Sequence, residues 1–352
     1  MSRLKEPRSP LATLTRRSLL AVAPAGLLAA CEPRMPLTAS TTPKLDIEGL
    51  QKAVDAIAAT ALPGMLGVGL MNLESGQSFL TNPDRPFPMQ SVFKLPLAAA
   101  VLGEVDAGHL GLTTRLTILE DQLSPQHSPI ATAWPGRRDY TVEELLEAVL
   151  IESDNTAADV LMSHIGGPGV VTAWLIGKRV PEIRVDRYER ELPADIYGMP
   201  SFRPAWRDPT AFAAARDAVP PKVRMAAMRR YMADPRDTST PRGMLEFLQR
   251  LDRGELLSAD STRRLTDLMS RCTRGAGRIR AGLRPGAFLA HRPGTSGVDQ
   301  GLSTVHNDVG VFTLADKRAY ALAVFLSGAT LDDTGRDRVI AQVASAAVRA
   351  VG

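Results

Sequence analysis

Ser91-Val-Phe-Lys94 opens the apolar run at residues 95–102, and this arrangement decides how the chain is interpreted. Side chains three apart on a helix share a face, so the Ser91 hydroxyl and the Lys94 amine are expected to meet. The run that follows is apolar on all sides, which is typical of a buried helix. A lysine amine held away from water has a lowered pKa and can accept the serine proton. The pattern predicts Ser91 as a nucleophile and Lys94 as its base.

The scarcity of lysine supports the role of Lys94. Beyond position 31 the chain has six lysines, at positions 44, 52, 94, 178, 222 and 317, and it uses arginine for most of its positive charge. Arginine stays protonated in proteins, so it could supply charge at this position but could not act as a base.

Ser153-Asp154-Asn155 follows Ser91 by 62 residues and lies within another helical pattern. Alone, this triplet is as typical of a cap between two helices as of a functional site. Beside Ser91 and Lys94, the functional interpretation is favoured. The second hydroxyl and the carboxamide would then handle protons and substrate, as in serine acyl transferases.

The charge distribution argues against a nucleic-acid-binding protein. The 352 residues carry a net charge of +4, and residues 1–31 hold five basic side chains and one acidic one. Removing these from the totals of 42 and 38 leaves 37 of each sign, so the rest of the chain is neutral.

The leader predicts export. Arg16-Arg17 precedes an apolar stretch at residues 19–30, which is too short to span a bilayer and resembles a twin-arginine signal. Leu28-Ala-Ala-Cys31 resembles a lipobox, so residues 1–31 are interpreted as an export signal and Cys31 as a lipidation site. The protein would then be periplasmic or at the cell surface. The alternative is a plain signal peptide in which Cys31 is incidental.

The other cysteine, Cys272, would have no partner for a disulfide once Cys31 is acylated or removed. Nothing nearby in the sequence suggests a metal site, so Cys272 is expected to be a small, buried, apolar side chain.

Strand patterns near both ends of the chain, with helices between them, predict an α/β plus all-α fold. An antiparallel sheet domain flanked by helices would be built from both termini, with a helical domain inserted. The predicted elements are a helix over 45–62, a hairpin of 66–71 and 77–80, helices from 91 to about 269, strands within 287–328 (309–313 and 319–326 among them) and a helix over 333–351. The predicted parts are a tether at 32–43, a split α/β domain at 44–86 and 276–352, and a helical domain at 87–275.

With these motifs, the chain resembles a class A serine β-lactamase from about residue 45 to 351. Residues 187–192 (Arg-Tyr-Glu-Arg-Glu-Leu) resemble the omega-loop motif Arg-x-Glu-x-x-Leu, and residues 234–241 resemble the segment that closes this loop. Residues 290–297 lie where the family has its Lys-Thr-Gly strand.

The resemblance implies hydrolysis of β-lactams through an acyl-enzyme on Ser91. Glu189 would activate the deacylating water, and Arg187 would pair with Asp237 to brace an extended omega loop at 187–238. Ser153 would pass a proton to the leaving nitrogen.

The resemblance also implies a set of substrate contacts. The backbone N–H groups of Ser91 and Thr295 would form the oxyanion hole, and Asn155 would bind the side-chain amide of the substrate. Arg278 and Arg292 would face its carboxylate, with Gly294 on the same strand. His127 would line the cleft entrance, or it would be an ordinary surface-loop histidine.

Three departures from the family pattern stand out. Arg292-Pro293-Gly294 replaces Lys-Thr-Gly and loses a hydroxyl, although the strand can tolerate Pro293 if its missing N–H would have faced the site. Pro193 replaces an asparagine that helps Glu189 hold water. Glu189 and Asp237 are 48 positions apart, so most of residues 194–233 is an insertion. Helical patterns at 212–219 and 223–232 suggest that the insertion is a flap near the cleft.

Two other functions remain open at this stage. Pro193 favours a penicillin-binding or slow-deacylating acyl trap as one alternative, and a non-catalytic β-lactamase-like surface lipoprotein is the other. The predicted partner is a small β-lactam, with no cofactor, no metal and no nucleic acid. Membrane contact is expected only through the export signal or lipid anchor, and the protein is expected to be a monomer.

Overall fold

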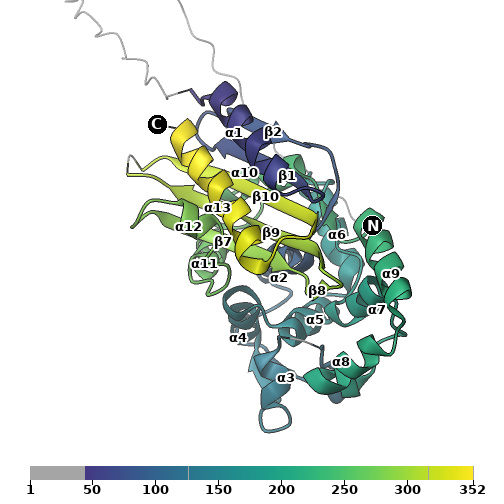
Figure 1. The fold of residues 1–352 in the computed structure, drawn as a ribbon. Coiled ribbons are helices and arrows are strands. Elements are labelled where there is room, and N and C mark those ends of the chain that lie inside the picture. Colours follow the sequence, from purple (N-terminus) through teal and green to yellow (C-terminus); the bar gives the residue numbers. More distant parts are fainter. Residues whose placement is uncertain (1–43, 126, 316, 352) are drawn as a thin grey trace, which may run out of the picture. The chain divides into compact units, whose positions relative to one another are not determined.

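The computed structural model describes residues 44–125, 127–315 and 317–351; the leader, Cys31 and the tether lie outside them. Six strands form one antiparallel sheet, namely β1 (Met65–Asn72), β2 (Ser78–Thr81), β7 (Phe288–Thr295), β8 (Val298–Asp299), β9 (Leu302–Thr313) and β10 (Ala319–Ala329). The order is β2-β1-β10-β9-β7, with β8 also paired to β9 (Figure 1). The first and last strands of the described chain are therefore neighbours, and the sheet is built from both termini.

Apolar side chains cover both faces of this sheet. Along β10, Leu322 and Val324 belong to one hydrophobic cluster, whereas Ala323 and Phe325 belong to another. Successive side chains on a strand point to opposite faces. The unbroken apolar run of β10 is what a central strand buried on both sides requires.

The cluster that contains Leu322 packs under α1 (Ile47–Thr60), α12 (Ile279–Gly282) and α13 (Asp333–Ala350) (Figure 1). The predicted first helix, 45–62, is confirmed but shorter, because Asp46 caps it by accepting a hydrogen bond from Gly49 N at 2.9 Å. The predicted hairpin of β1 and β2 and the final helix are also confirmed.

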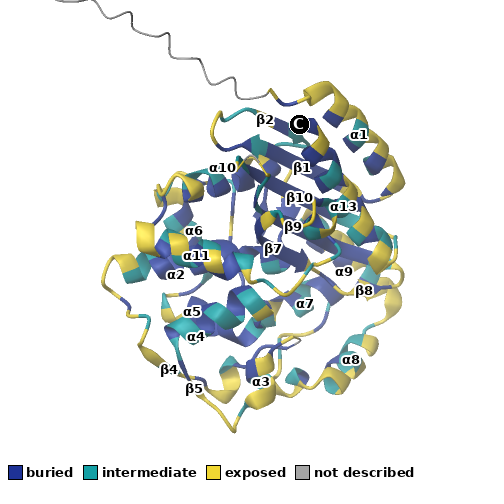
Figure 2. Ribbon diagram, turned by 90° about the vertical axis from the view of Figure 1, so that its left-hand side faces the viewer, coloured by how far each residue is buried: buried dark blue, intermediate teal, exposed yellow. Residues whose placement is uncertain are grey.

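The cluster that contains Phe325 joins the other face of the sheet to a group of helices, and the buried surfaces meet there (Figure 2). These helices are α2 (Lys94–Asp106), α3 (Pro129–Ala133), α4 (Val142–Glu147), α5 (Asn155–His164), α6 (Pro168–Gly177), α10 (Pro241–Asp252) and α11 (Ala259–Ser270). Every residue of α2 from Lys94 to Leu102 is buried, as its apolar pattern predicts.

Two short ladders escaped the sequence analysis, β3 (Phe87–Pro88) with β6 (Thr238–Ser239) and β4 (Arg115–Thr117) with β5 (Asp139–Thr141). Strands of two or three residues are too short to show an alternating pattern. The first ladder, extended by a 2.9 Å hydrogen bond from Met89 N to Asp237 O, joins the segment before Ser91 to the end of the insertion.

The insertion is helical, as predicted. It contains α7 (Leu192–Tyr197), α8 (Pro209–Asp217) and α9 (Pro221–Ala233). α8 and α9 begin slightly earlier than the apolar patterns suggested, because Pro209 and Pro221 occupy their first positions, where a missing N–H costs nothing.

β9 also begins earlier than its apolar core at 309–313 suggested. Its first half includes His306, Asn307 and Asp308, which are polar yet buried and hydrogen-bonded. The predicted fold class is confirmed, and the finer division into domains stays a prediction. Among the described residues no single helix could cross a membrane; α5 and α6 meet the length and composition criteria together, but with a 70° bend between them.

Candidate active site

Ser91 lies in a 3-10 turn, η1 (Gln90–Phe93), that runs directly into α2. Lys94 is the first residue of α2, and its Nζ lies 3.2 Å from Ser91 Oγ. A 3-10 turn has three residues per turn, so side chains three apart point the same way. Lys94 is fully buried, whereas Ser91 lines a cavity. The structure thus brings the predicted nucleophile and base together.

The surroundings of the Lys94 amine favour its neutral form. Burial is the main cause that lowers the pKa of Lys94; the carboxylate of Glu189 opposes this effect and the charge of Arg292 adds to it. Nζ also lies 2.9 Å from Ser153 O and 3.1 Å from Glu189 Oε1. A neutral amine keeps a lone pair that can accept the Ser91 proton.

Ser153-Asp154-Asn155 serves as a helix cap and as part of the cavity wall. Asp154 caps α5 by accepting a hydrogen bond from Ala157 N at 2.8 Å. Ser153, in the left-handed conformation (φ 67°), and Asn155 flank it and line the cavity. Ser153 Oγ lies 3.3 Å from Ser91 Oγ. The two interpretations of this triplet therefore apply to different residues within it.

Glu189 begins η4 (Glu189–Glu191) and reaches the same point from the opposite side. Its Oε1 lies 3.5 Å from Ser91 Oγ, and the residue is 6% exposed. Two oxygens and one nitrogen, from Glu189, Ser153 and Lys94, therefore surround the Ser91 hydroxyl. Pro193, which follows in α7, also lines the cavity and offers no donor there.

Asp237 clamps the two ends of the long segment that carries Glu189. Its Oδ1 accepts hydrogen bonds from the backbone N–H groups of Asp186 at 2.7 Å and Arg187 at 3.1 Å. Arg187 Nε donates to Asp237 Oδ2 at 2.5 Å, and both side chains are buried. The ion pair that the resemblance implied is thus present in the structure.

Asp159 on α5 is a residue that the sequence analysis missed. Its Oδ1 accepts a hydrogen bond from Glu189 N at 2.7 Å, and its Oδ2 accepts from Arg190 N at 3.1 Å and Ser124 Oγ at 2.5 Å. Burial raises the pKa of Asp159 to about 6. Asp159 lies one helical turn after Asn155, and this i+4 spacing is the signal that could have revealed it.

Asp159 is expected to make the stability of the protein depend on pH. Folding raises the pKa of Asp159 from an ordinary value near 4 to about 6, so the folded protein holds this proton more tightly than the unfolded chain does. The resulting contribution to the free energy of unfolding is fully present below pH ~4 and is lost as pH rises through about 6. A shift of about two pK units corresponds to about 2–3 kcal/mol. Urea unfolding from pH 4 to 8 should therefore show a steeper loss of stability in the wild type than in Asp159→Asn. Parallel curves would contradict this assignment; Asp121→Asn, at an exposed carboxylate, is the control.

Arg278 lies at the cavity and is held in place from behind. Its Nη2 donates to Thr295 Oγ1 at 2.6 Å, its Nη1 to Asn307 O at 2.8 Å and its Nε to Asp337 Oδ1 at 3.0 Å. Arg278 and Thr295 both line the cavity. This position suits the predicted contact with a substrate carboxylate.

Arg292 is placed differently from the expectation, because it is fully buried and does not line the cavity. Its Nε donates to Ser91 O at 2.9 Å, its Nη1 donates to Leu150 O at 3.1 Å, and its Nη2 donates to Ser153 Oγ. A direct ion pair with a substrate carboxylate does not fit these contacts. Arg292 instead fixes the positions of Ser91 and Ser153.

Gly294 is required by a close approach of backbones rather than by contact with the cavity. A Cβ at this position would lie 2.3 Å from Met89 O and 3.0 Å from Val92 N. β7 therefore passes against the turn that carries Ser91, and the next residue, Thr295, reaches the cavity. β7 is an edge strand, so Pro293 is tolerated there.

Cys272 is only partly buried, so the prediction of a buried side chain is wrong. It lies in the turn after α11, and its Sγ lies 3.9 Å from Arg292 Nη1. It is a free thiol within the part of the chain that the structure describes.

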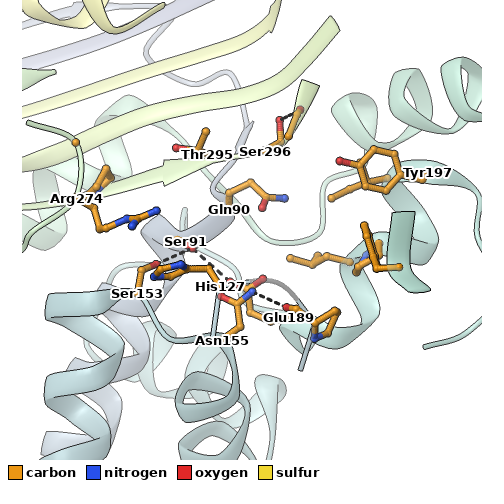
Figure 3. A pocket seen from close by; sticks show the side chains of 18 of the residues that line it. Gln90, Ser91, His127, Ser153, Asn155, Glu189, Tyr197, Arg274, Thr295 and Ser296 are labelled. Carbon is orange, nitrogen blue, oxygen red and sulfur yellow. Dashed lines mark hydrogen bonds between the residues drawn. The ribbon is translucent and has the colours of Figure 1, made fainter. Parts of the chain in front are cut away.

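The cavity has a volume of about 380 Å³ and opens over Ser91 (Figure 3). His127 lines its entrance and is exposed, with Nε2 2.7 Å from Glu152 O, so it fits both predicted roles. Gln90 lines the cavity as well, and its Nε2 donates to Tyr231 Oη at 2.7 Å. This contact joins residues 141 positions apart, so no local sequence pattern indicates it. No three His, Cys, Asp or Glu side chains gather as a metal site within the described ranges.

A serine, a buried lysine and a carboxylate around one cavity, between a sheet and a set of helices, define a serine hydrolase that works by covalent catalysis. A sequence model described as the Beta-lactamase enzyme family matches residues 49–351. The chain belongs to this family, and its relatives make it a class A serine β-lactamase.

Relatives match the chain over nearly all of its described length. Beta-lactamase L2 of Stenotrophomonas maltophilia is 32% identical over 90% of this chain and 88% of its own, and beta-lactamase VEB-1 of Pseudomonas aeruginosa is 28% identical over 85% and 87%. A crystal structure of a β-lactamase from Chitinophaga pinensis covers 84% of this chain and 97% of its own with a TM-score of 0.70 and 31% identity. These matches confirm the resemblance inferred from the motifs.

Proposed function

We propose that this protein hydrolyses β-lactams through an acyl-enzyme formed on Ser91. The observation that carries the proposal is the convergence on Ser91 Oγ of Lys94 Nζ at 3.2 Å, Ser153 Oγ at 3.3 Å and Glu189 Oε1 at 3.5 Å. Each neighbour can take or give a proton, and hydrolysis through an acyl-enzyme requires such transfers in both of its halves.

In the first half, Lys94 Nζ takes the Ser91 proton and Ser91 Oγ attacks the lactam carbonyl carbon. The negative charge that develops on the carbonyl oxygen would be stabilised by the N–H groups of Ser91 and Thr295. Ser153 Oγ then gives its proton to the lactam nitrogen as the carbon–nitrogen bond breaks, and it recovers a proton from Lys94. Arg292, which donates to Ser153 Oγ, stabilises the oxygen while it is short of a proton.

In the second half, Glu189 takes a proton from a water molecule that attacks the ester carbon. Ser91 Oγ leaves and takes back the proton from Glu189 through Lys94 Nζ, which lies 3.1 Å from Glu189 Oε1 and 3.2 Å from Ser91 Oγ, and the opened product is released. Asp159 holds the backbone N–H groups of Glu189 and Arg190, so it positions the carboxylate for this step. Arg278 and Thr295 would bind the substrate carboxylate, Asn155 its side-chain amide, and His127 would border the entrance.

A second candidate, a slow-deacylating acyl trap, is favoured by Pro193. This residue lines the cavity beside Glu189, where its side chain offers no hydrogen bond to a water molecule. Ser91 would still be acylated in this case, but the ester would persist.

One experiment separates the two candidates. Residues 32–352 are mixed with a chromogenic cephalosporin, and product absorbance and intact protein mass are followed together. Sustained turnover is expected, with at most a transient adduct. A stoichiometric burst followed by a lasting adduct on Ser91 would favour the trap, and the absence of both signals would exclude either function.

Export by the leader and a lipid anchor at Cys31 complete the proposal. Both rest on residues 16–31, which lie outside the described part of the chain. The mass of the mature N-terminal peptide from the producing cell tests them, since a diacylglyceryl group on Cys31 is expected.

A further inference from the structure

The cavity has two chemically different ends, with Ser91 between them. Figure 3 shows Arg274 on one side of Ser91 and Tyr197 on the opposite side. Arg278 and Thr295 also line the cavity and bond to each other at 2.6 Å, which adds a second cation to its polar lining. A substrate that carries a carboxylate will be oriented by these cations.

The insertion, together with the start of α7 just before it, supplies the apolar end. α7 contributes Leu192, Ile196 and Tyr197 to the cavity lining, and α8 contributes Phe212. The rings of Tyr197 and Phe212 meet edge to face, with centroids 6.3 Å apart and an interplanar angle of 74°. We call these four residues the aromatic wall.

The aromatic wall is anchored to the rest of the fold at three points. α9, which packs against α7, is held by a buried ion pair between Arg224 Nε and Asp299 Oδ2 at 2.7 Å. Tyr231 of α9 accepts the 2.7 Å hydrogen bond from Gln90, the residue before Ser91. A Cβ on Gly297 would lie 2.9 Å from Tyr197 Oη, so the phenol packs directly on the segment after β7. A wall fixed in this way is pre-organised for binding.

We infer that Tyr197 and Phe212 are specificity-determining residues that select β-lactams with an aromatic group on the acyl side chain. The inference rests on the proposed function. When the carboxylate lies at the Arg278 end and the lactam carbonyl lies over Ser91, the acyl side chain extends toward Tyr197. An aromatic group there buries its area against two rings and gains the further attraction of edge-to-face contacts.

A pair of substrates that differ in the acyl group alone tests the inference. Benzylpenicillin carries a phenylacetyl group, whereas 6-aminopenicillanic acid has the same rings and carboxylate and no acyl group. The ratio of kcat/KM between them should fall about 10- to 100-fold in Tyr197→Ala and in Phe212→Ala. Most of the loss should appear in KM for benzylpenicillin.

Trp206→Leu is the matched control. Trp206 belongs to the same hydrophobic cluster as Tyr197 and Phe212 but does not line the cavity, so this variant loosens the cluster and should leave the ratio unchanged. If the alanine variants do not fold, Phe212→Leu replaces them. Leucine keeps most of the apolar volume, so this variant should fold, and because it lacks the ring it should still lower the ratio.

The outcomes separate the inference from the function beneath it. If the wild type hydrolyses both substrates and the ratio is the same in the Tyr197 and Phe212 variants, the aromatic wall does not select and the proposed function stands. An equal fall of the ratio in Trp206→Leu would also overturn the inference. If the wild type neither turns over nor is acylated by either substrate, the proposed function fails instead.

Discussion

Ser91→Ala is expected to lower kcat for a chromogenic cephalosporin by about 10⁵-fold or more, because the variant has no oxygen with which to form the acyl bond. Intact mass should show no adduct at any time. Lys94 keeps its contacts with Ser153 O at 2.9 Å and Glu189 Oε1 at 3.1 Å, so the remainder of the site should hold its shape. Stopped-flow absorbance and mass spectrometry measure the two effects.

The matched control is Ser163→Ala, at an exposed serine of α5. It should leave both turnover and adduct formation as they are in the wild type. Turnover above about 1% of wild type in Ser91→Ala would place the nucleophile elsewhere, since removal of a nucleophile costs far more than that. A thermal midpoint of Ser91→Ala equal to that of the wild type would show that the variant is folded and that its loss of activity comes from the missing hydroxyl.

Glu189→Gln is expected to separate the two halves of the reaction. Without a general base the water is a weak nucleophile, so deacylation should slow by about 10²–10⁴-fold. Ser91 and Lys94 remain in place, so acylation should continue and the enzyme should accumulate as an adduct of substrate mass. Quenched-flow mass spectrometry reports the fraction of acyl-enzyme against time.

Glu191→Gln is the control for this variant. Glu191 lies on the same short turn but is exposed, and its carboxylate accepts a hydrogen bond from Tyr188 N that glutamine can also accept. Its kinetics should match those of the wild type. A deacylation rate in Glu189→Gln equal to that of the wild type would mean that another group activates the water.

The parts of the site that the sequence predicted are local in the chain or belong to a recognisable motif. Ser91 and Lys94 are three positions apart, so helical geometry alone brings them together. The role of Glu189 was predicted from the omega-loop motif, since the residues around it in the sequence do not distinguish it from a solvated acidic residue. The fold class followed from strand patterns near both ends and from the apolar run after Lys94.

The parts that the sequence could not predict depend on distant contacts. Arg292 was expected at the cavity because of the family resemblance, but it donates hydrogen bonds to Ser91, Leu150 and Ser153, which are far from it in the chain. Tyr231 reaches Gln90 across 141 positions. Tertiary packing determines such contacts, and the periodicity of either segment does not predict them.

The clamp at Asp237 has a consequence for how this protein can diversify. The hydrogen bonds of Asp237 with Asp186 and Arg187 close the segment between them into a loop. The free-energy cost of closing such a loop grows by only about 0.6 kcal/mol when its length doubles. Glu189 follows Arg187 by two residues, so helices can be inserted or replaced farther along the loop without moving its carboxylate. Changes in this loop can therefore alter the residues that line the cavity while Ser91, Lys94 and Glu189 keep their positions.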